Sequence, residues 1–191
     1  MRPIIILLFA LLTFSCADLK PKEVDLYFDI KSVLIDQSAS LKQDNVELHK
    51  LAVVNGDSSS NSFVPDSLGW ADEFQIISDA DINKPALRRQ YSISEQDDDN
   101  SNLKIQTYTA EKEDLVTQSL KIYYLDKIEN LKKIEILQKQ TNSIFKSTKT
   151  ITIHFDEIQL ESRIISYVIE GHQKMILQDR VDFNIKGSLQ H

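Results

Sequence analysis

Residues 151–170 read ITIHFDEIQLESRIISYVIE, and this stretch decides the fold class. Ile151, Ile153 and Phe155 alternate with polar residues, and a denser apolar run follows at 164–169. Successive side chains of a strand point to opposite sides of a sheet, so a period of two is typical of a strand with one buried face. The stretch therefore predicts two consecutive strands.

The same period occurs on both sides of this stretch. It is present at 103–106, 116–124, 134–136 and 175–185, which brings the expected number of strands to about six. The expected links are Glu111–Asp114, Asp126–Asn130, the residues around Thr141, Asp156–Glu157 and Gly171–His172. Links this short cannot hold parallel crossovers, which need a dozen or more residues. The sequence therefore predicts an antiparallel meander.

The N-terminal part has helical spacing instead. Apolar residues recur every three or four positions from Glu23 to about Asp44, and again from Ser67 to Asp79, where Trp70 is the only tryptophan. Asp66 or Ser67 is the expected N-cap of the second helix. We expect an α+β fold in which these N-terminal helices pack on one face of the long antiparallel meander sheet, which is open and curved. Closure around a cavity, as in small ligand-binding barrels, is the alternative.

A hairpin is expected between the two helices. The apolar stretch Leu48–Val54 is followed by Asn55 and Gly56, and both of these residues accept the positive φ of a type I′ turn. The return arm contains the serines at 58–62, which suits an exposed edge. A further turn is expected at the acidic run 97–100.

The charge balance bears on possible partners. The chain has 22 basic and 29 acidic residues, a formal net charge of −7. Binding of nucleic acid depends on neutralisation of phosphates by Lys and Arg, so we expect no nucleic-acid partner. The same balance disfavours an electrostatic grip on anionic lipids.

The first sixteen residues indicate where the protein resides. Arg2 is followed by an apolar run and then by Ser15 and Cys16, the only cysteine. The run is too short to cross a bilayer as a helix, which needs about 20 residues, but it suits a signal peptide. The stretch resembles a bacterial lipoprotein signal. An ordinary secretory signal and an uncleaved buried helix are the alternatives, and the lone cysteine favours the lipoprotein because a secreted domain would leave it without a disulfide partner.

The resemblance implies a domain organisation. Residues 1–15 would be the signal peptide, 16–22 a lipidated tether, and 23–191 a single α+β domain. Cys16 would be the lipidation site, with fatty acyl chains such as palmitate as the membrane contact. Asp18 and Glu23 are separated rather than clustered, which favours the periplasmic side of the outer membrane as the location.

Catalytic motifs are absent from the sequence. It contains no Gly-x-Ser-x-Gly elbow, no glycine-rich phosphate loop and no His-Glu-x-x-His helix. The acidic run at 97–100 lacks the glycine and glutamate that an EF-hand loop requires. His154 and Asp156 lie two positions apart and could share a metal, but a third ligand is missing. We therefore expect no enzyme activity, no cofactor, and no catalytic, cofactor-binding or metal-ligating residue.

A binding role remains the leading hypothesis. The segment 79–89 combines acidic residues with Lys84, Arg88 and Arg89, and we treat these three residues, with Trp70, as a candidate contact loop for an envelope protein partner. A core position is the competing interpretation of Trp70. The alternatives for function are a carrier of an apolar ligand held between helices and sheet, and a hydrolase with a scattered active site.

Overall fold

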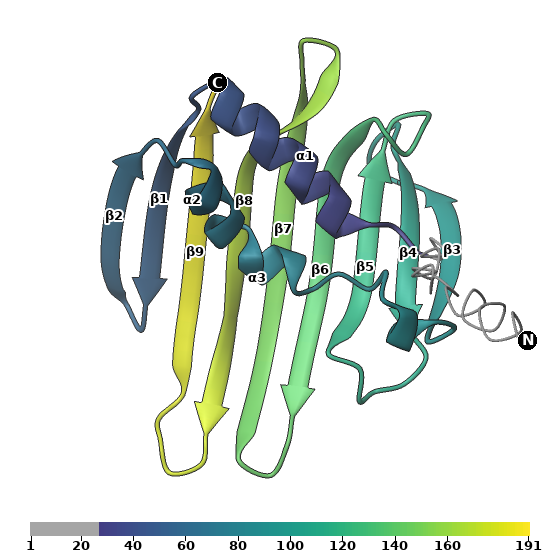
Figure 1. The fold of residues 1–191 in the computed structure, drawn as a ribbon. Coiled ribbons are helices and arrows are strands. Elements are labelled where there is room, and N and C mark those ends of the chain that lie inside the picture. The colour runs from purple at the N-terminus through teal and green to yellow at the C-terminus, as the bar shows by residue number, and fades with distance from the viewer. Residues whose placement is uncertain (1–26) are drawn as a thin grey trace, which may run out of the picture.

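A computed structural model describes residues 27–191 of the chain. The expected signal peptide at 1–15, the tether at 16–22 and the lipidation site Cys16 lie outside these residues. Within 27–191, the chain is mostly antiparallel sheet with a few helices (Figure 1).

The sheet has nine strands, in the order β2-β1-β9-β8-β7-β6-β5-β4-β3, and every neighbouring pair is antiparallel. Their bounds are β1 Glu47–Val54, β2 Asp57–Phe63, β3 Tyr91–Asp97, β4 Lys104–Ala110, β5 Thr117–Tyr124, β6 Leu131–Thr141, β7 Phe145–Ile158, β8 Glu161–Met175 and β9 Val181–Gln190. The predicted antiparallel meander is confirmed as the run from β3 to β9, and the β1–β2 hairpin extends it beyond β9.

The expected number of six strands is wrong. The β1–β2 hairpin was predicted on its own, but its pairing with β9, at the other end of the chain, leaves no local signal. Strand β3 is exposed at every position except Tyr91, because it is an edge strand. It therefore lacks the alternation of apolar and polar residues that identified the other strands.

Two expected links are also wrong. Asp156–Glu157 lies within β7, and the chain reverses instead at Gln159 and Leu160, both of which have positive φ. Gly171 lies within β8 opposite Lys149, where a Cβ would collide with the backbone of Thr148. This glycine permits close approach of two strands rather than a turn. The β8–β9 turn begins only after Met175.

The helices are shorter than expected. Helix α1 spans Ile30–Gln43 rather than beginning at Glu23, and the carboxylate of Asp29 accepts the amide of Ser32 at 2.8 Å as its N-cap. The second expected helix is divided at Phe74 into α2, Ser67–Glu73, and α3, Gln75–Ser78. Asp66 caps α2 by accepting the amide of Gly69 at 2.8 Å. A 3-10 turn follows at Pro85–Leu87.

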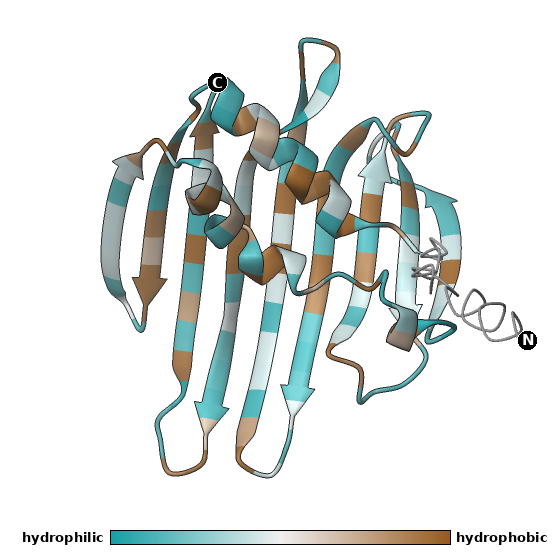
Figure 2. Cartoon of the chain, in the orientation of Figure 1, coloured by the Kyte–Doolittle hydropathy of each residue, from teal (hydrophilic) through white to brown (hydrophobic). Residues whose placement is uncertain are grey.

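The core joins helices and strands. Ile30 and Leu34 of α1 and Trp70 of α2 belong to one buried cluster with strand residues such as Ile134 and Ile151. The helices lie in front of the strands in Figure 1, and Figure 2 shows apolar and polar positions alternating along the strands. The long strands β6 to β9 extend well past the helices toward the turns after β6 and β8 (Figure 1).

Candidate binding groove between the helices

A groove of about 390 Å³ lies between α1 and the α2–α3 pair. Its lining residues come from these helices and from Phe74 between α2 and α3, and none comes from the sheet: Lys31, Leu34, Ile35, Ser38, Ala39, Ser67, Ala71, Phe74, Gln75 and Ser78. Its volume falls within the range of about 300–1,000 Å³ that is usual for ligand pockets.

The sequence of the helices explains why the groove is there. Leu34 and Phe74 are buried and also belong to the core cluster, so they connect the groove with the interior. Ala39 and Ala71 have short side chains, which leave space between the helices. Ile35 is 59% exposed although it is large and apolar.

Two of the five polar side chains in the lining form local hydrogen bonds. The Ser38 hydroxyl donates to the carbonyl of Leu34 at 2.7 Å, and the Gln75 amide donates to the Asp79 carboxylate at 2.6 Å. Lys31 is exposed and adds one positive charge. Half of the lining is apolar, so the groove is suited to apolar groups, with polar side chains making up the other half.

A partly buried polar cluster fixes the end of α2 beside this groove. Glu73 accepts hydrogen bonds from the Lys50 ammonium, at 2.9 Å, and from the Tyr167 hydroxyl. Burial, together with the bond to Glu73, raises the pKa of Tyr167 well above its usual range. Tyr167 thus stays a protonated hydrogen-bond donor, and the cluster attaches α2 to β1 and β8.

Trp70 does not lie on the surface. It is fully buried and stacks on Phe74, with ring centroids 5.6 Å apart. Phe74 in turn meets Tyr167 edge-on at 6.2 Å. Trp70 therefore has the core position that the sequence offered as the competing interpretation, and it cannot contribute to a contact surface with the basic residues of the loop.

The loop from 79 to 89 is held against the body of the protein. Ala80, Asp81 and Ile82 are buried, and burial raises the pKa of the Asp81 carboxyl. Lys84 donates to the carbonyl of Asp79 at 3.1 Å. Lys84, Arg88 and Arg89 are all exposed, so these three residues remain available as a contact surface.

His154 and Asp156 both lie in β7, with a β-bulge between His154 and Phe155. Asp156 is exposed and lies 3.9 Å from the Lys132 ammonium. Among the described residues, no three His, Cys, Asp or Glu side chains are grouped so that they could hold a metal ion. In the same part of the chain, no helix has the length and apolar character needed to cross a bilayer.

Sequence reasoning did not find the groove. Small residues such as Ala39 and Ala71 on the exposed sides of two helices were its only local signal, and the way the helices face each other is a tertiary property.

Comparison of the chain with protein-family models, with curated proteins and with solved structures finds no match.

Proposed function

We propose that the protein is a non-enzymatic, lipid-anchored binding domain of the bacterial cell envelope. Its binding site is the groove between α1 and α2–α3, and its partner is an envelope protein that places apolar side chains in this groove. The apolar lining of the groove, formed by Leu34, Ile35 and Phe74 among others, is the observation that carries the proposal.

The proposal treats the three helices as a layer on one face of the sheet. Hydrogen bonds between the helices and the strands of the sheet support this arrangement. Gln37 of α1 bonds to two backbone groups of β8, and Glu73 of α2 bonds to Lys50 and Tyr167. The space between helices and sheet is occupied by large buried side chains such as Trp70, so a partner would approach the outer side of the layer.

The form of the groove favours a protein partner. Large apolar side chains are exposed on all three helices, at Ile35, Leu68 and Ile76. Of these three residues only Ile35 lines the groove, so exposed apolar surface on the helices extends beyond it, which favours a protein partner over a small molecule. The exposed basic residues of the loop that follows α3, Lys84, Arg88 and Arg89, would supply a second contact, for acidic groups of the partner.

A carrier of an apolar ligand is the second candidate. The volume of the groove favours it, since about 390 Å³ is enough for a small apolar molecule. The ligand would then lie between the helices rather than between helices and sheet, as the sequence had suggested.

A photo-crosslinking experiment separates the two candidates. A photoreactive amino acid at Ser38, which lines the groove, should give a protein adduct in cells. Ala39→Phe with Ala71→Phe fills the groove and should remove the adduct. The control, Ser94→Phe, changes an exposed small residue of the edge strand β3, away from the groove and the 79–89 loop, and should leave the adduct in place. A small-molecule adduct would instead establish the carrier, and an adduct that survives filling of the groove would contradict both.

The anchor has its own test. We propose that acyl chains on Cys16 hold the domain at the outer membrane, facing the periplasm. Cys16→Ser should then move the protein from the membrane fraction to the aqueous fraction. In the protein without this substitution, mass spectrometry of the N-terminal peptide should find acyl chains on Cys16. A Cys16 that is free in the native protein would disprove the anchor.

A further inference from the structure

Two neighbouring turns at the far end of the long strands expose large apolar side chains. The turn after β6 contains Ile144, which is 57% exposed, and the β8–β9 region contains Met175, Ile176 and Leu177, which are 40%, 61% and 100% exposed. Figure 2 shows apolar colour at both turns. We call these four residues the apolar tip.

The two turns form one unit. Phe145 of β7 pairs with Met175 of β8, and the amide of Ile176 donates to the carbonyl of Ile144 at 2.9 Å. The Asn142 side chain accepts the amides of Ile144 and Phe145, at 3.0 and 2.8 Å, and closes the first turn. The apolar side chains are therefore presented together by a hydrogen-bonded scaffold.

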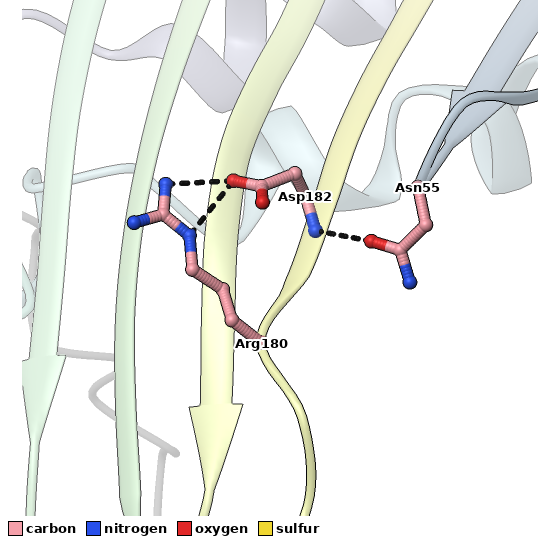
Figure 3. Close-up of polar contacts among 3 residues, drawn as sticks. All are labelled: Asn55, Arg180 and Asp182. Carbon is pink, nitrogen blue, oxygen red and sulfur yellow. Dashed lines mark hydrogen bonds and ion pairs between the residues drawn. The ribbon is translucent and has the colours of Figure 1, made fainter.

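The base of the second turn is fixed as well. The side-chain oxygen of Asn55, from the β1–β2 turn, accepts the backbone amide of Asp182 at 2.8 Å, and the backbone amide of Asn55 donates to the carbonyl of Asp182 at 2.9 Å. The Arg180 guanidinium donates twice to the Asp182 carboxylate, at 2.9 and 2.7 Å (Figure 3). This cluster ties the start of β9 to β1 and pairs the charge of Arg180.

Exposure and backbone strain do not by themselves assign a role to the tip. Leu177 has a φ of 60°, in the left-handed region that favours glycine or asparagine. Leu160, in the β7–β8 turn at the opposite end of the sheet, has a φ of 67° and is 89% exposed. The two residues differ in their neighbours. Leu160 has acidic residues on both sides, Glu157 and Glu161, whereas Leu177 belongs to the apolar tip, which has lysines beside it.

The local charge around the apolar tip is opposite in sign to the net charge of the chain. Lys146 and Lys174 pair across β7 and β8, directly next to the apolar residues, and Lys139 is exposed near the end of β6. The charged residues in 139–149 and 171–182 are Lys139, Lys146, Lys149, Lys174, Asp179, Arg180 and Asp182, and the last two neutralise each other as an ion pair. Positive charge therefore predominates here, although the whole chain has a net charge of −7.

We propose that the apolar tip enters the interfacial region of a bilayer that contains anionic lipids. Apolar side chains with lysines behind them suit a membrane surface, because the former can reach the acyl boundary while the latter meet the phosphates. The charge complementarity favours this occupant over a protein. The contact is separate from the acyl chains on Cys16, and a single acyl chain or a single weak contact gives only marginal attachment.

Fluorescence quenching at the two ends of the sheet tests the proposal. The full chain, purified from bacterial membranes, is reconstituted in phosphatidylcholine vesicles with or without phosphatidylglycerol. An environment-sensitive dye is attached through Gln178→Cys, next to Leu177, or through Gln159→Cys, next to Leu160. Nitroxide-labelled lipids should quench the dye at 178 several-fold more than the dye at 159, and more strongly with phosphatidylglycerol. The chain without an introduced cysteine controls for labelling at Cys16.

Matched variants test the cause of the quenching. Ile176→Ser with Leu177→Ser, or Lys146→Glu with Lys174→Glu, should reduce quenching at 178 to the level found at 159. Leu160→Ser and Lys127→Glu, both in turns at the opposite end, should leave it unchanged, and circular dichroism checks that each variant is folded. Equal quenching at the two positions, or quenching at 178 that neither double variant reduces, overturns the proposal. Both labelled variants have the same N-terminus, so the difference in quenching between positions 178 and 159 does not depend on acylation of Cys16.

Discussion

Gly187 is the residue on which the packing beside the groove depends most directly. It lies in β9 opposite Tyr167 of β8, and a Cβ at this position would occupy the space of the tyrosine ring. The ring is fully buried and its hydroxyl donates to Glu73. A glycine on one strand therefore lets a tyrosine on the next strand reach the end of α2.

We expect Gly187→Ala to destabilise the protein by about 1–3 kcal/mol, the usual cost of an extra group in a filled core. Urea unfolding followed by circular dichroism measures the change. Ser188→Ala, at the next and exposed position of β9, is the control and should change stability by less than about 0.5 kcal/mol. Equal effects of the two substitutions would show that Tyr167 does not need the glycine.

Helix α1 shows what a sequence pattern can and cannot provide at the scale of an element. Its helical spacing predicted the buried positions Ile30, Leu34 and Leu41, because the period of a helix is a local property. Its attachment was not predictable. Gln37 donates to the carbonyl of Ser162 at 2.8 Å and accepts the amide of Ile164 at 2.9 Å, across 125 or more positions of sequence.

Removing this attachment should loosen α1. Gln37→Ala leaves the amide of Ile164, a fully buried residue, without its partner, and a lost buried hydrogen bond of this kind costs about 1–3 kcal/mol. We expect faster amide hydrogen exchange along α1 and a lower unfolding midpoint. Gln43→Ala, at the exposed end of the same helix, should have little effect. Unchanged exchange in the Gln37 variant would mean that apolar packing alone holds the helix.

The predicted turns likewise include one whose signal is local and one whose glycine has a role set by a distant strand. Asn55 and Gly56 predicted the β1–β2 hairpin, and both residues have positive φ, at 51° and 94°. This success has a local cause, since the turn geometry is encoded by the two residues that adopt it. Gly171 was assigned to a turn and instead allows β7 to approach β8, a role that depends on a strand more than twenty positions away.

At the scale of the whole molecule, the sequence predicted the antiparallel meander but not its full extent. The pairing of β1 with β9 adds the β1–β2 hairpin to the sheet, and with the edge strand β3 it brings the number of strands to nine. The groove between the helices and the basic surroundings of the apolar tip also arise from distant segments. Periodicity identifies strands and helices one at a time, whereas these sites depend on which elements become neighbours.

The tyrosines give the whole molecule a pH dependence. Burial, the largest cause, raises the pKa of Tyr91, Tyr123 and Tyr124 to about 12, and it also raises the pKa of Tyr108 and Tyr167. Hydrogen bonds to Glu135 and Glu95 add to the effect at Tyr123 and Tyr124. In the unfolded chain a tyrosine ionises near its ordinary pKa of about 10.

The sign of the pH effect follows from this difference. Below about pH 10 the tyrosines are protonated in both states, and their contribution to stability is fully present. Between about pH 10 and 12 the unfolded chain releases protons that the folded protein retains, so the free energy of unfolding should fall as the pH rises. Urea midpoints at about pH 8 and about pH 11, with tyrosinate absorbance followed in parallel, measure this fall.

Tyr91→Phe also removes the bond from its hydroxyl to the carbonyl of Thr117, so it should lower stability at both pH values but reduce the difference between them. If the midpoint is independent of pH across this window, or if the folded protein shows tyrosinate absorbance from all of its tyrosines near pH 10, the buried hydroxyls are not protected as the structure implies.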